Sequence, residues 1–187
     1  MRPCFCVFVF LFPVLDGRLM ASDEVSFELD VQPILTSKGC NSGACHGKQG
    51  GQNGFQLSLL GFDSNFDFSA ITRESRGRRV FPAAPEKSLF LQKATAEVPH
   101  GGGKRIQENS ENYNVLKQWL IQGGRRKAEN ETTLQRISLN QTDELLGPGE
   151  KQQLTVTAHY ADGSKRNVTG VSTFQSNDPA IVSVDPK

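Results

Sequence analysis

The sequence predicts a multidomain chain, with a mainly α-helical domain over residues 22–124 and a truncated all-β domain over residues 134–187. Apolar residues recur at helical spacing in the first part, and from Leu134 onward the spacing changes to the alternation typical of strands. Between the two parts, residues 125–133 (RRKAENETT) are polar and charged, which is typical of a linker.

The first 21 residues have the pattern of a secretory signal peptide. Arg2 supplies a positive charge, and Cys4 to Leu15 form an apolar run of twelve residues. This run is too short to span a bilayer but suits the apolar core of a signal. A retained N-terminal anchor is the alternative. We expect an exported protein, periplasmic or at the cell surface, whose mature chain has no transmembrane span, two cysteines, three histidines and no methionine.

Four helices are predicted in the first part. Residues 26–39 place one apolar face together, and Pro33 is tolerated there only near a helix start; the face comprises Phe27, Val31, Ile34 and Leu35. A second helix follows the capping pair Asp63-Ser64, and a third covers residues 86–94. The fourth opens at Ser110, carries the only tryptophan, and stops at Gly123-Gly124. A short extended segment is expected at residues 55–60.

The second part reads as strands. Residues 153–160 alternate, residues 161–164 (ADGS) suit a hairpin turn, and strand-like chemistry resumes over residues 165–176 and again over 180–185. About four strands are fewer than the roughly seven of an immunoglobulin-like sandwich. Either the chain is a fragment or another chain completes this unit, and we favour a fragment.

The stretch Cys40-Asn-Ser-Gly-Ala-Cys45-His46 carries the most specific chemistry. Two cysteines followed by a histidine suit covalent haem attachment, with His46 as proximal iron ligand, although the usual spacing is C-x-x-C-H. A local Cys40–Cys45 disulfide is the plainer alternative in an exported protein. A zinc site would need four nitrogen or sulfur ligands, and only two further histidines remain.

The second axial ligand of such a haem has few candidates, because no methionine survives signal removal. His100 lies in a loop, after a proline and before three glycines. It is either the distal ligand or an ordinary exposed histidine. Tyr113, Lys104 or no ligand at all are the other options, and His159 reads as a structural or surface residue of a strand.

Charge and composition limit the other functions. The formal net charge is +1 and no basic block is present, so nucleic acid is not an expected partner. No nucleophile–base set is visible, so any catalysis would come from an open haem site or from domains downstream. One arginine cluster could contact haem propionates or an acidic redox partner, although a solvated face paired with Glu74 or Glu86 is the plainer interpretation; its members are Arg73, Arg76, Arg78 and Arg79.

These residues resemble a known family. The stretches FELDVQPILTSKGCNSGACHGKQGGQNGFQLSLLGFD, GRRVFPAAPEKSLFLQKAT, VPHGGGKR and NVLKQWLIQGG are similar to the planctomycete-type cytochrome c domain of large exported proteins. The stretch LTVTAHYADGSKRNVTGVSTFQSNDPAIVSVD is similar to a bacterial immunoglobulin-like (group 2) domain. The fold that this implies is a cytochrome c-like domain followed by a partial immunoglobulin-like sandwich.

The resemblance implies haem c bound by Cys40 and Cys45, with His46 as axial ligand. More typical members carry Met-Pro-Pro where this chain has Val98-Pro99-His100, which favours His100 as the substitute distal ligand. The implied function is one-electron transfer or redox sensing with an unknown redox partner. The alternative is a haem-free adhesion module with a Cys40–Cys45 disulfide, associated with a cell surface or polysaccharide through the β domain.

Overall fold

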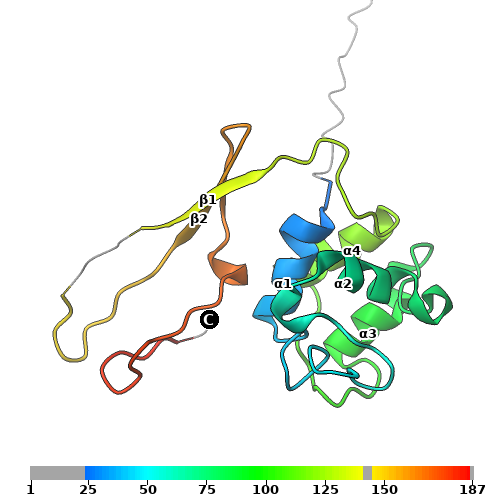
Figure 1. The fold of residues 1–187 in the computed structure, drawn as a ribbon, viewed down its shortest axis with the longest axis horizontal. Coiled ribbons are helices and arrows are strands. Elements are labelled where there is room, and N and C mark those ends of the chain that lie inside the picture. Colours follow the sequence, from blue (N-terminus) through cyan, green and yellow to red (C-terminus); the bar gives the residue numbers. More distant parts are fainter. Residues whose placement is uncertain (1–23, 141–144, 186–187) are drawn as a thin grey trace, which may run out of the picture.

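The computed structural model describes residues 24–140 and 145–185; the predicted signal peptide lies outside them. Figure 1 shows a group of short helices beside an extended β-hairpin. The α-helices are α1 (Gln32–Ser37), α2 (Ser64–Thr72), α3 (Leu89–Thr95) and α4 (Glu111–Ile121). The strands are β1 (Leu134–Leu139), β2 (Val156–Tyr160) and β3 (Lys165–Asn167). A π-helical turn, Phe27–Val31, leads into α1.

The apolar face predicted over residues 26–39 is confirmed as a core face. All four of its members are at most 2% exposed. They pack with side chains from the loops and from α2, α3 and α4, namely Leu57, Ala70, Ile71, Leu91, Ile106, Leu116, Trp119 and Leu120. Trp119 lies against the Phe27 and Phe90 rings, with centroids 5.8 and 6.1 Å away. Since several of these contributors lie outside helices, short helices suffice for one shared core.

The capping signals act at the predicted positions. Asp63 accepts a hydrogen bond from the Phe66 amide at 3.0 Å, and Ser110 accepts one from the Tyr113 amide at 3.3 Å. Each bond satisfies an amide that the first helical turn leaves unpaired. Pro33 lies in the first turn of α1, directly after the π-helical turn, where a proline is tolerated.

Two local predictions need correction. The helix predicted over residues 86–94 begins only at Leu89, because Pro85–Lys87 forms a separate 3-10 turn before it. Residues 55–60 form no strand: Phe55 makes a single bridge to Gln52, and Leu59–Gly61 is a 3-10 turn. A short apolar run does not by itself distinguish a strand from a buried loop.

The three strands form one antiparallel sheet in the order β1-β2-β3. The hairpin turn at residues 161–164 is confirmed, with the Gly163 amide donating to the Tyr160 carbonyl at 3.0 Å. Gly163 has a φ of +83°, which favours glycine. Residues 180–185 form no strand, although their alternation predicted one.

The predicted fold class is wrong. The described chain is a mixed α/β structure of four short helices and one three-stranded sheet. It is not a mainly α cytochrome c-like domain followed by an immunoglobulin-like sandwich. No second sheet covers β1 within the described residues, and Ile137 is 65% exposed. Alternation predicts strands, but it does not determine how many strands pair or what covers them.

The sheet-bearing part also packs against the helices. Val171, which follows β3, contacts the hydrophobic cluster of the helices. Arg166 of β3 forms an ion pair with Asp30, whose side chain is 9% exposed. Through these contacts the two parts, predicted as separate domains, share packing.

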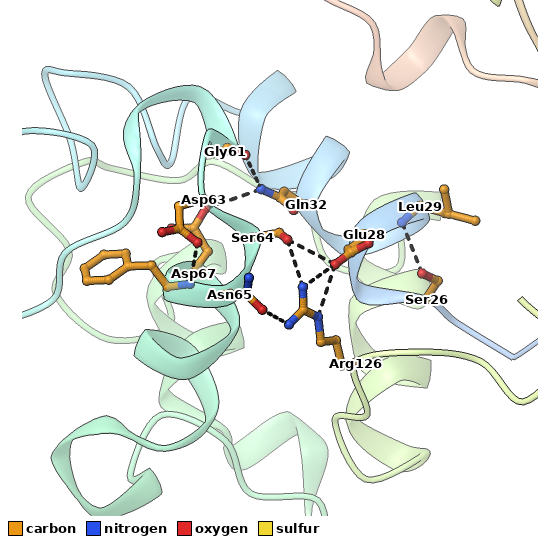
Figure 2. Close-up of polar contacts among 11 residues, drawn as sticks. Ser26, Glu28, Leu29, Gln32, Gly61, Asp63, Ser64, Asn65, Asp67 and Arg126 are labelled. Atoms are coloured by element: carbon orange, nitrogen blue, oxygen red, sulfur yellow. Dashed lines mark hydrogen bonds and ion pairs between the residues drawn. The ribbon is translucent and has the colours of Figure 1, made fainter. Parts of the chain in front are cut away.

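A polar network ties the start of the predicted linker to the helices. Figure 2 shows the Arg126 guanidinium among Glu28, Ser64 and Asn65, and it donates to all three. The Arg126 carbonyl accepts from the Phe27 amide at 3.0 Å. The hydrogen bond to Arg126 also lowers the pKa of the Glu28 carboxyl. These bonds join the N-terminal helical turn, α2 and the segment after α4.

Among residues 24–140 and 145–185, none of the helices has the length and apolar character needed to cross a bilayer.

Candidate functional site

Cys40, Cys45, His46 and His100 line a single cavity of about 420 Å³. The loop after α1 supplies the first three, and the loop after α3 supplies His100. Apolar side chains complete the wall, among them Leu35, Leu57, Phe90 and Leu116. Volumes of about 300–1,000 Å³ with mostly apolar walls are usual for small-molecule and cofactor sites.

The six-residue Cys40–Cys45 loop is folded back on itself by backbone hydrogen bonds. The Cys45 amide donates to the Ser42 carbonyl, and the His46 amide to the Cys40 carbonyl, both at 3.0 Å. Gly47 is required for this return, because a Cβ there would lie 2.0 Å from the Asn41 carbonyl oxygen. The extra two residues of the motif therefore form a closed turn that leaves both thiols on one cavity.

The two thiols are free and differ in their surroundings. Burial raises the pKa of the Cys40 thiol to about 11. The Cys45 sulfur accepts a hydrogen bond from an Nη of Arg105 at 3.7 Å.

This difference predicts unequal alkylation of the haem-free protein. With a pKa near 11, about one Cys40 thiol in a thousand is ionised at pH 8, and the thiolate is the reactive form. Iodoacetamide followed by peptide mass spectrometry should find Cys45 modified first. The Cys40 rate should keep rising as the pH approaches 11. Equal rates at pH 8, with urea-unfolded protein as the reference for equal access, would contradict the prediction.

His46 is held as a neutral ring with one nitrogen available. Its Nδ1 donates to the Phe55 carbonyl oxygen at 2.9 Å, and its ring lies 4.5 Å from the Phe55 ring centre. Burial lowers the pKa of His46, which favours the neutral imidazole. With the proton on Nδ1, the Nε2 lone pair is free to bind a metal, an arrangement usual for metal-ligating histidines.

His100 has a matching arrangement. Its Nδ1 donates to the Gly103 carbonyl oxygen at 2.9 Å, so this hydrogen bond does not engage Nε2. The His46 and His100 rings are 8° from parallel, with centroids 6.2 Å apart. This separation is too large for direct stacking contact. The structure thus brings together the two histidines that the sequence placed 54 positions apart.

The other candidate ligands lie elsewhere. His159 is on β2, where its Nε2 is 2.8 Å from the Ser138 hydroxyl. Tyr113 and Lys104 do not line the cavity. Within the described part of the chain, no group of three or more His, Cys, Asp or Glu side chains is arranged to hold a metal ion.

The cavity is lined by cations and by no acidic side chain of the described residues; the cations are Arg78, Arg79, Lys93 and Arg105. The predicted arginine cluster is therefore divided. Arg73 and Arg76 are exposed and lie outside the cavity, whereas Arg79 is 4% exposed at its wall.

Sequence reasoning did not identify Lys93, Arg105 or Phe55 as residues of this site. Their positions in the sequence carried no spacing or motif that could have indicated it. Only the approach of α3 and two loops places them around the motif.

Comparisons with family models, curated proteins and solved structures find no match to this chain.

Proposed function

We propose that the protein is an exported c-type haem-binding protein that transfers single electrons or senses redox state. This proposal rests on one observation: the near-parallel imidazoles of His46 and His100 line the cavity that is also lined by both thiols. The proposal is built on this site and not on a fold family, because function follows the arrangement of site residues.

The spacing of the imidazoles supports a metal between them. Metal–nitrogen bonds of about 2 Å on each side place the two ring centres about 6 Å apart when both rings point at the metal. The observed separation is 6.2 Å. Each Nδ1 is engaged by a backbone carbonyl, so Nε2 of each ring would be the atom that binds a metal. In this assignment His46 is the proximal ligand and His100 the distal one.

The thiols and the cations support a porphyrin as the carrier of that metal. Cys40 and Cys45 would hold haem c as thioethers, and Arg78, Lys93 and Arg105 would pair with its carboxylates. Haem, when bound, supplies a one-electron iron couple. The chain itself would orient both imidazoles, supply apolar walls that exclude water, and balance the negative charge of the haem carboxylates.

Export is part of the proposal, because covalent haem attachment and a signal peptide belong to the same compartment. It rests on the sequence of residues 1–21. The partner is a redox protein that remains to be identified.

The test is expression of the full chain in a host with an export and haem-ligation system. We expect a haem-stained band that survives denaturing electrophoresis, and a Soret absorption band. A protein that is exported and folded, has a Cys40–Cys45 disulfide by mass spectrometry, and shows neither signal would reject the proposal and support the adhesion alternative.

The distal assignment predicts a spectral change in His100→Ala. Two imidazoles give a six-coordinate iron, so loss of one should leave a five-coordinate, high-spin spectrum while covalent haem is retained. His159→Ala is the matched control, because His159 lies on the sheet, and its spectrum should equal that of the unmodified protein. An unchanged six-coordinate spectrum in His100→Ala would remove His100 from the site.

A further inference from the structure

Arg79 is a buried cation with an unusual set of partners. Its side chain is 5% exposed, and its two terminal nitrogens donate to the Ala70 and Gly54 carbonyl oxygens at 2.7 and 2.9 Å. These carbonyls belong to α2 and to the glycine-rich loop. Burying a guanidinium is costly, and backbone carbonyls satisfy its hydrogen bonds without neutralising its charge.

The charge is only weakly compensated. The nearest carboxylate oxygen paired with Arg79 is that of Glu74 at 3.9 Å, and the Glu74 side chain is 44% exposed. Solvent screens a partner of that kind. Because no acidic residue of the described chain lines the cavity, Arg79 leaves a net positive charge at its wall.

Arg79 also supports the residue that holds His46. Its guanidinium carbon lies 4.5 Å from the Phe55 ring centre, in cation–π geometry. The Phe55 ring also lies 4.5 Å from the His46 ring, and the Phe55 carbonyl accepts a hydrogen bond from His46 Nδ1. The distance from the Arg79 guanidinium carbon to the His46 ring centre is therefore no more than the sum of these two 4.5 Å distances.

We infer that Arg79 is a positioning and charge-setting residue: it holds Phe55 against His46 and stabilises the reduced form of a metal bound there. The inference rests on the proposed haem function. Reduction removes one positive charge from the metal centre, so a nearby fixed cation favours the reduced state. At about 10 Å and an effective dielectric constant of about 20, one unit charge changes such an equilibrium about tenfold.

The test is the midpoint potential of three haem-loaded variants of the full chain, measured by redox titration. Arg79→Gln should lower the potential by about 59 mV, which is a tenfold change for one electron. Arg79→Lys keeps the charge and should stay close to the unmodified protein. Arg73→Gln is the matched control, because Arg73 is also over a phenylalanine ring, Phe68, at 5.8 Å, but is exposed and outside the cavity.

The outcomes separate this inference from the proposed function. Normal covalent haem with an unchanged potential in Arg79→Gln overturns the charge-setting role and leaves haem binding standing. An equal fall in Arg79→Lys and Arg79→Gln overturns it too, because charge would then not be the cause. If Arg79→Gln does not fold, Arg79→Lys alone decides: a midpoint potential about 59 mV below that of the unmodified protein contradicts the inference. Absence of haem from the unmodified protein rejects both proposals.

Discussion

A protein in which Cys40→Ser and Cys45→Ser are combined is expected to carry no covalently bound haem. Serine preserves size and hydrogen bonding, but its hydroxyl does not form a thioether with the porphyrin. Both thiols face the cavity that holds the two imidazoles, so no other described cysteine can replace them. The readout is haem staining after denaturing electrophoresis, with protein mass as a second measure. Full covalent haem in the double variant would reject the assignment.

The single variants distinguish the two attachment points. Each should retain one thioether and shift the reduced haem spectrum, because one vinyl group stays unsaturated. Cys45→Ser is expected to give the larger loss, since the Cys40 thiol that remains is buried and its pKa is raised to about 11. A larger loss in Cys40→Ser would contradict this expectation.

Trp119→Ala is expected to lower the free energy of unfolding by about 3–5 kcal/mol, the usual cost of removing a buried aromatic side chain. Trp119 is fully buried, contacts the Phe27 and Phe90 rings, and donates from Nε1 to the Arg125 carbonyl at 2.7 Å. The variant removes the packing and leaves that carbonyl without its donor. Urea unfolding of the haem-free protein, followed by circular dichroism, measures the loss.

Two controls bracket this result. Trp119→Phe keeps most of the packing and should cost less than the alanine variant. Phe62→Ala, at a side chain that is 94% exposed, should change the free energy of unfolding by no more than about 0.5 kcal/mol. A loss below about 1 kcal/mol in Trp119→Ala would mean that this tryptophan is not central to the core.

The parts of the fold that were predicted correctly depend on local rules. The face of Phe27, Val31, Ile34 and Leu35 follows from helical spacing, and the caps at Asp63 and Ser110 follow from unpaired amides in a first turn. The boundaries that were wrong depend on contacts with other segments of the chain. Pro85–Lys87 forms a separate 3-10 turn, and residues 180–185 pair with no strand of the described chain.

The candidate site shows the same division. The sequence placed two thiols and a histidine together and isolated His100 as a candidate. It could not show that the His46 and His100 rings lie near one another and almost parallel. That arrangement depends on how α1, α3 and two loops pack. Nor could it separate Arg79 from Arg73 and Arg76, since all three have the same local composition and only one is buried.

By itself, the sequence determined which atoms are available: two thiols, three imidazoles and no methionine after the predicted signal. It also determined where α2 and α4 begin, because capping is a contact between residues a few positions apart. The tertiary structure alone decided the fold class, the burial of Arg79 and the shared cavity. Those properties arise from contacts between distant segments, and a sequence pattern records the surface each segment can bury but not the partner that buries it.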